Sequence, residues 1–242
     1  MSRLYLIRHG QAGTRDNYDA LSDLGRQQSR LLGEYFVNQG LNFTSAISGP
    51  NARQQQTAEE VRAAYQSANL NFPEITIDEG WKEFDLDHIY RELAPRLGAD
   101  DPQFQKDFET MREEVRANRG DPQAEIHRRW TPSDGKVVQA WIHQRYPYSG
   151  ESWKDFRQRI ANRRAQIQEG REPANIAIFT SATPTAIWAG LALNLDEVHI
   201  FSLAGVLQNS AFSVLRQRNG DLRLFSYNEV PHLPSLKMRS HR

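Results

Sequence analysis

Short apolar runs bounded by polar residues recur along the chain and predict buried strands. The first run covers residues 3–7, and similar runs occupy residues 45–48, 75–77 and 175–180. Runs of this kind between turn residues are typical of strands inside a sheet.

The C-terminal part of the chain predicts a hairpin followed by a tail. Residues 211–215 and 222–227 flank Asn219-Gly220, a dipeptide that favours a tight turn between antiparallel strands. Residues 237–242 are basic and polar, and we expect them to be frayed at the surface.

Between the strands, apolar residues recur at helical spacing. One helix follows Ser22, a residue type that commonly caps helices, and ends before Gly40. Further helices are predicted at about residues 52–66, 151–168 and 184–193. Helices that alternate with strands imply a mostly parallel sheet covered on both faces. The predicted fold class is therefore α/β, a three-layer α/β/α sandwich.

The middle of the chain, at about residues 86–146, contains no convincing strand pattern. We expect its prolines to break it into short helices: Pro95, Pro102, Pro122, Pro132 and Pro147. This segment is predicted to be a helical insertion over the functional site. No linker-like segment divides the chain, so residues 1–242 are expected to form one domain.

Composition excludes several classes of protein. Of the 242 residues, 38% are hydrophobic and 25% are charged, as in soluble globular domains. Basic and acidic residues balance at 30 each, so the total charge does not call for nucleic acid or an acidic membrane surface. Cysteine is absent, and no apolar segment is long enough for a signal peptide or a membrane span. We expect a cytoplasmic protein and leave open whether it forms a homodimer.

Candidate chemistry begins where the first strand ends, at Arg8-His9-Gly10-Gln11. An imidazole can attack phosphorus as a nucleophile, and a guanidinium pairs with two phosphate oxygens at once. Glycine lets the backbone approach a ligand closely. A histidine after a strand is also common as a purely structural residue, so this segment alone does not establish a site.

A second arginine, Arg53, lies at the start of the helix predicted at 52–66. The positive end of a helix favours an anion, which makes Arg53 a candidate phosphate ligand. The alternative interpretation is a solvated arginine on a helix surface.

Four acids lie close together further along the chain: Asp78, Glu79, Glu83 and Asp85. A carboxyl group in a partly apolar setting can have a raised pKa and donate a proton to a leaving oxygen. The residues themselves do not select one of the four.

These segments resemble the sequence blocks of the histidine phosphatase superfamily, the phosphoglycerate-mutase-like proteins. The blocks occur in family order at residues 6–12, 21–28, 48–58, 150–159, 209–210 and 228–233. Together the matches run from about residue 3 to residue 234. The resemblance implies the same three-layer α/β fold.

The resemblance also implies a mechanism and selects Glu83 among the acids. His9 would attack phosphorus and form a phosphohistidine. Arg8 and Arg53 would neutralise the phosphoryl oxygens, Gln11 would contact the phosphate or substrate, and Glu83 would protonate the leaving alcohol. A small phosphate monoester would be hydrolysed without a metal or organic cofactor. The alternatives are a phosphoglycerate-mutase-type phosphotransferase and a catalytically weak phosphate-binding or regulatory protein.

The chain departs from the family pattern after the strand at 175–180. The family places a second histidine there, and its position aligns with Ala182. A methyl group can neither donate a hydrogen bond nor carry charge. We expect the phosphate contact of this loop to come from Ser181, Thr183 or backbone amides at the following helix start.

Overall fold

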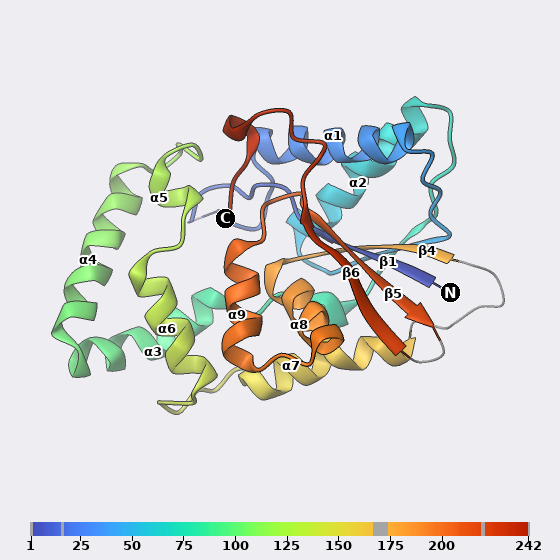
Figure 1. Cartoon of the computed structure of the whole chain (residues 1–242). Helices are drawn as coiled ribbons and strands as arrows, with labels where there is room; N and C mark the ends of the chain where they lie inside the picture. Colours follow the sequence, from blue (N-terminus) through green and yellow to red (C-terminus); the bar gives the residue numbers. More distant parts are fainter. Residues whose placement is uncertain (1, 16, 167–173, 219–220, 242) are drawn as a thin grey trace.

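The structure is a computed structural model that describes residues 2–15, 17–166, 174–218 and 221–241. Its strands build one sheet (Figure 1) and have these bounds: β1 (Ser2–Arg8), β2 (Ser45–Ser48), β3 (Ile75–Ile77), β4 (Ala174–Thr180), β5 (Phe212–Arg218) and β6 (Asp221–Glu229). The strand order is β3-β2-β4-β1-β5-β6.

The helices of the described residues have the following bounds: α1 (Asp23–Asn38), α2 (Ala52–Ser67), α3 (Leu86–Asp100), α4 (Pro102–Ala117), α5 (Glu125–Arg128), α6 (Pro132–Ile142), α7 (Trp153–Asn162), α8 (Ala182–Leu193) and α9 (Glu197–Val206). Short 3-10 turns add η1 (Glu79–Trp81), η2 (Arg163–Gln166) and η3 (Leu236–Met238).

The pairing of the strands confirms the predicted α/β class. β1 is parallel to β4, and β2 is parallel to both β3 and β4. β5 runs antiparallel to β1 and to β6, which confirms the C-terminal hairpin. Its expected turn at Asn219-Gly220 lies outside the described residues.

Side chains of β1 alternate between two separate cores, which explains the three layers. Leu4 and Leu6 are buried in one core with residues of α7 and α8. Tyr5 and Ile7 are buried in the other core with residues of α1 and α2. Because successive side chains of a strand point to opposite faces, the single apolar run of β1 packs against both helical layers. Figure 1 shows α1 and α2 above the sheet and α7 and α8 below it.

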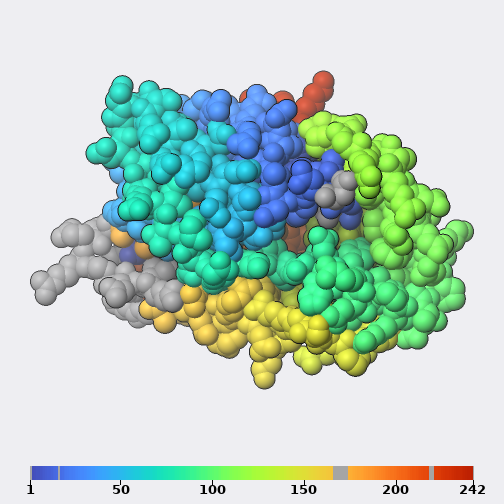
Figure 2. Space-filling model, turned by 180° about the vertical axis from the view of Figure 1, so that it is seen from behind, coloured from blue at the N-terminus to red at the C-terminus, as the bar shows by residue number. Residues whose placement is uncertain are grey.

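Residues 86–146 contain α3, α4, α5 and α6 and, all being described, no strand. Figure 2 shows these helices (green to yellow-green) forming one side of the molecule beside the blue N-terminal residues. A buried ion pair ties them to the loop after β1, because Arg15 donates to both carboxylate oxygens of Asp134 at 3.0 and 2.8 Å. That the whole chain is one domain stays a prediction.

Several predicted boundaries were wrong. Pro95 does not break a helix but lies inside α3. The helix predicted at 151–168 ends at Asn162 and continues as η2, while residues 167 and 168 lie outside the described part. The sequence pattern also missed α9, whose apolar residues are not confined to one face, since Val198 and Val206 are exposed.

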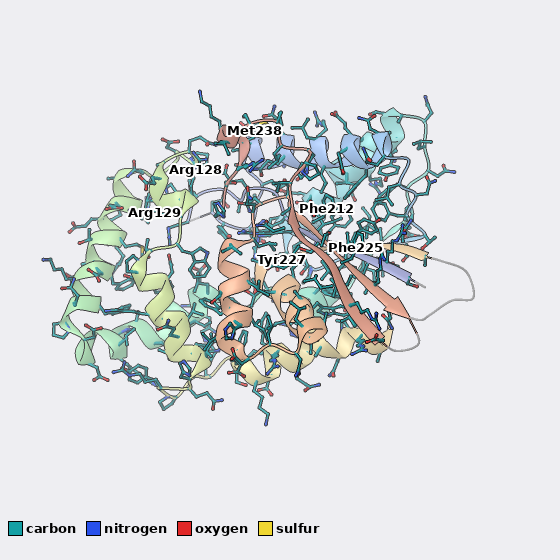
Figure 3. All side chains as sticks on the ribbon, viewed as in Figure 1. Arg128, Arg129, Phe212, Phe225, Tyr227 and Met238 are labelled. Carbon is teal, nitrogen blue, oxygen red and sulfur yellow. The ribbon has the colours of Figure 1, made fainter. Side chains whose placement is uncertain are left out.

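The tail predicted to be frayed is instead docked. Ser240 is buried, and its hydroxyl donates to Asn209 Oδ1 at 2.9 Å. The Gln28 side-chain amide donates to the Met238 carbonyl at 2.6 Å and to the Ser240 hydroxyl at 3.2 Å. Arg128 of α5 also reaches the Arg239 carbonyl, and Figure 3 labels Arg128 and Met238 on the same side of the molecule.

Candidate functional site

Parallel pairing brings the predicted site residues together at one edge of the sheet. Arg8 ends β1 opposite Thr180, which ends the neighbouring strand β4. The backbone amide of His9 donates to the Thr180 carbonyl at 2.9 Å. The carboxyl ends of β1, β2 and β4 therefore place His9, Arg53 and Ala182 around one opening, where α/β sheets commonly bind ligands.

His9 is buried, and its hydrogen bonds define which ring nitrogen is available for chemistry. Nδ1 lies 2.7 Å from the Gly10 carbonyl, which can only accept, so Nδ1 carries the proton. Nε2 therefore has a lone pair, and it accepts from Arg53 Nε at 3.2 Å. Burial, followed by the charges of Arg53 and Arg8, holds the pKa of His9 well below its ordinary value. The ring is neutral near pH 7 and can act as a nucleophile.

Arg53 is buried beside His9, so the interpretation as a solvated arginine was wrong. It is the second residue of α2, close to the positive helix end. Its NH1 nitrogen donates to Asp19 at 2.8 Å, and its guanidinium lies 4.8 Å from the ring centroid of Tyr18. These contacts orient the guanidinium towards His9.

Arg8 is also buried, and its guanidinium is held by two backbone carbonyls from the C-terminal part of the chain. It donates through NH1 to Leu207 and through NH2 to His241, the second contact at 2.9 Å. Burial lowers the pKa of Arg8 from its ordinary value, but a guanidinium stays charged in proteins. The docked tail thus helps to orient Arg8, a candidate phosphate ligand, through the His241 carbonyl.

Glu83 faces His9 and Arg53 across the same opening. Its Oε2 accepts from the Thr183 amide and its Oε1 from the Phe84 amide, both at 3.1 Å. Burial raises the pKa of Glu83 above its ordinary value, although the hydrogen bonds from Thr183 and Phe84 oppose the shift. A carboxyl group with a raised pKa can hold the proton that a leaving oxygen needs.

The other acids of the cluster have structural contacts. Asp78 accepts from Arg163 at 3.0 Å and from the Gly80 amide. Asp85 caps α3 by accepting from the His88 amide at 2.9 Å. Glu79 is exposed and lies outside the described lining of the opening. The geometry therefore favours Glu83, which the resemblance had selected.

These residues line a cavity of about 670 Å³. Six predicted residues are among its described lining: Arg8, His9, Arg53, Glu83, Ala182 and Thr183. Gln11 and Ser181 are not. Gln11 Oε1 accepts from the Ser22 hydroxyl, and the Ser181 hydroxyl accepts from Gln54, each at 2.8 Å. Because the Thr183 amide is used by Glu83, the loop does not offer this donor to a phosphate.

Sequence reasoning missed part of the lining. Tyr18 and Asp19 follow the segment around His9 closely, and their nearness in sequence was the signal that could have found them. Phe201 comes from α9, and only the tertiary structure brings it to the cavity beside Trp130 of the insertion.

Removing the residues after Met238 is expected to weaken the binding of inorganic phosphate by roughly tenfold or more, because Arg8 loses the His241 carbonyl and its charge becomes less well oriented. Titration calorimetry measures the affinity, and a thermal melt measures the stability of the truncated chain. Lys237→Ala, an exposed change on η3, is the matched control. Equal phosphate affinities of the truncated and parental chains would contradict this role.

Within the described residues, every helix is too short or too polar to span a membrane. The same residues contain no cluster of three histidine, cysteine, aspartate or glutamate side chains that could hold a metal ion.

An α/β sandwich with a buried histidine and two arginines at the carboxyl edge of its sheet is the arrangement expected of a protein that handles phosphate. The chain belongs to the histidine phosphatase superfamily (branch 1), whose family model matches residues 4–140 and 119–230. No curated protein matches the chain.

Solved structures share this fold at low sequence identity. Phosphoserine phosphatase from Entamoeba histolytica is 16% identical over 96% of this chain and 100% of that chain, with a TM-score of 0.61. Bacillus stearothermophilus YhfR is 18% identical over 96% and 99% of the two chains, with a TM-score of 0.62. The alpha-ribazole phosphatase from Shigella flexneri is 17% identical over 94% and 96%, with a TM-score of 0.58. These likenesses show the fold.

Proposed function

We propose that the protein is a phosphatase that hydrolyses a phosphate monoester through a phosphohistidine at His9. The observation that carries the proposal is the neutral His9 ring, whose Nε2 lone pair lies beside Arg53 in a cavity that also contains Glu83. Family membership supports the same reaction class. The named activities of the similar structures differ, so the fold does not choose the substrate.

The reaction balances with the groups present. Nε2 of His9 attacks phosphorus while the bond to the alcohol oxygen breaks, and Glu83 gives that oxygen its proton. The Glu83 carboxylate then takes a proton from water as the water oxygen attacks the phosphohistidine. Phosphate leaves, and the neutral His9 and the protonated Glu83 are restored. Arg8 and Arg53 stabilise the charge on the phosphoryl oxygens in both steps.

The direct test is mass spectrometry of the chain after a brief incubation with an aryl phosphate and an alkaline quench, together with phosphate release. We expect phosphate on His9 and continuing release of phosphate. Labelling of His9 with transfer to an added alcohol in place of release would favour a phosphotransferase. Tight binding of phosphate without labelling or turnover would favour a non-catalytic phosphate-binding protein and contradict the proposal.

Ala182→His is expected to raise turnover on an aryl phosphate by about tenfold or more. Ala182 lines the cavity at the start of α8, and the neighbouring Thr183 amide is already occupied, so the phosphate lacks a donor here. One preorganised donor typically contributes about 10²–10³ in rate. Leu193→His, an exposed change at the far end of α8, controls for adding a histidine. A folded Ala182→His protein with lower turnover would indicate a pocket rebuilt around a small residue.

A further inference from the structure

The cavity lining contains two groups of residues of different chemistry. Arg8, His9 and Arg53 form the group that we call the phosphate end. Apolar residues of the described lining form the group that we call the apolar end: Leu86, Trp130, Phe201, Ala204 and Gly205. A volume of about 670 Å³ lies within the range of roughly 300–1,000 Å³ that holds whole drug-sized ligands. A phosphoryl group at His9 therefore leaves most of the cavity unfilled.

Two aromatic rings form a wall of the apolar end. Trp130 and Phe201 meet edge to face with ring centroids 6.3 Å apart. Trp130 remains 36% exposed, although large aromatic side chains are usually well buried. Exposed ring surface inside a cavity gains most from a flat apolar group, which can pack on it in stacked or edge-to-face geometry.

Two glycines in the cavity wall are not explained by the fold. Gly135 lies in α6 and Gly205 in α9, and glycine inside a helix costs about 0.5–1 kcal/mol relative to alanine. A Cβ atom at either position would meet no heavy atom within 4 Å, and neither residue has a positive φ. Neither close packing nor backbone geometry requires glycine here. Both positions line the cavity, so their small size keeps space open for a ligand.

The wall that carries Phe201 and Gly205 is held in place from the sheet. Tyr227 of β6 donates from its hydroxyl to the Leu203 carbonyl of α9 at 2.7 Å, and Figure 3 labels Tyr227 beside this helix. Asn228 donates to the Val206 carbonyl at 2.9 Å. A wall fixed in this way is preorganised, which lowers the entropy cost of binding.

Charges along the lining disfavour a second anionic group on the ligand. The cation Arg15 is paired with Asp134, and Arg53 is paired with Asp19. Of the other charged groups in the described lining, Asp85 and Asp87 repel negative charge and outnumber the cation Lys82. A ligand that matches the cavity has one phosphate and an otherwise uncharged body.

We propose that the cavity selects phosphate monoesters whose alcohol carries a flat, uncharged apolar ring system, which packs between α6 and α9 against Trp130 and Phe201. Calling this ligand a substrate rests on the proposed phosphatase function. Its selection by the apolar end can be measured without turnover.

The test compares ethyl, phenylethyl and naphthylethyl phosphonates, which are not hydrolysed, by titration calorimetry. We expect affinity to rise along this series by at least about tenfold, since a larger apolar area leaves water. Gly205→Leu should fill the apolar end and bring the three affinities within about threefold of one another. Gly135→Leu, in a different helix, places a leucine side chain at the same cavity and is the alternative variant if Gly205→Leu does not fold. Trp130→Ala should also reduce the preference.

Val198→Ala is the matched control, because Val198 is an exposed residue of α9 outside the described lining of the cavity. It should leave the preference unchanged. Equal affinities for the three phosphonates would overturn the inference, as would a preference that folded Gly205→Leu and Gly135→Leu proteins retain. If the phosphonates show a ring preference in binding but the corresponding monoesters release no phosphate, the proposed phosphatase function is contradicted and the ring site is supported. If the esters release phosphate but the phosphonates show no ring preference, the ring site is contradicted and the phosphatase function is supported.

Discussion

Replacing His9 with alanine is expected to abolish phosphate release, with a loss of roughly 10⁴-fold or more in kcat on an aryl phosphate. The reason is that Nε2 of His9 supplies the lone pair that attacks the phosphorus of the substrate in the first step of the proposed mechanism. Arg8 and Arg53 would still bind phosphate in the variant. KM is therefore expected to change much less than kcat, and no phosphate should appear on the chain by mass spectrometry.

Stability should change little in the same variant. His9→Ala removes the hydrogen bond to the Gly10 carbonyl, which is worth about 0.5–1.5 kcal/mol, and the one that Arg53 Nε donates to Nε2, and it leaves a small void in the cavity. A thermal melt measures this effect separately from catalysis. His143→Ala, an exposed change after α6, is the control for losing a histidine. A folded His9→Ala protein with near-parental turnover would show that the nucleophile lies elsewhere.

Glu83→Gln is expected to slow the hydrolysis of alkyl phosphates by about 10²–10⁴-fold and that of nitrophenyl phosphate much less. Glutamine keeps the shape of the side chain but cannot give the leaving oxygen a proton. This proton matters most when the departing oxygen is strongly basic, as in an alkyl alcohol. Asp85→Asn is the matched control, because Asp85 also lines the cavity but caps α3. Equal losses on both substrates would contradict the role of Glu83 as the acid.

Glu83→Gln is also expected to change how kcat/KM depends on pH. Burial raises the pKa of Glu83, so its protonated form persists to higher pH than for an ordinary glutamate, and kcat/KM should fall as pH rises through this value. Burial lowers the pKa of His9, so the neutral nucleophile should persist well into the acid range. Glu83→Gln should therefore remove the alkaline fall in the pH profile of kcat/KM. Comparison on one substrate cancels the ionisation of the substrate itself.

Glu83 shows which features of the site could be predicted from the sequence and which required the tertiary structure. Local spacing placed four acids together but could not rank them, because pKa depends on burial and on partners from distant segments. In the structure, Arg163 pairs with Asp78, the start of α3 engages Asp85, and Glu79 faces solvent. Glu83 lines the cavity, and burial raises its pKa above the ordinary value.

For Arg53 and Ala182 too, the position in the chain could be predicted from the sequence, whereas the contacts could not. Their positions after β2 and β4 could be predicted from the sequence, because strand and helix patterns are local. Arg53 was expected at the start of a helix, whereas Ala182 was expected just before the helix at 184–193 and in fact begins α8. The contact of Arg53 with His9 could not be predicted, since it depends on β1, β2 and β4 ending at one edge of the sheet. Ser181, Thr183 and backbone amides at the following helix start were the donors expected for phosphate in this loop, and only the tertiary structure shows that the Thr183 amide donates to Glu83 instead.

The sequence by itself determined the strand that presents Arg8 and His9, the α/β class and the helical character of residues 86–146, because each of these follows from short-range periodicity. Tertiary structure decided the docking of the tail at Arg8, the existence of α9 and the meeting of Trp130 with Phe201. Each of these depends on groups far apart in the chain whose contacts leave no local pattern. α9 in particular is stabilised by the sheet and the apolar core, so its sequence needs no amphipathic repeat.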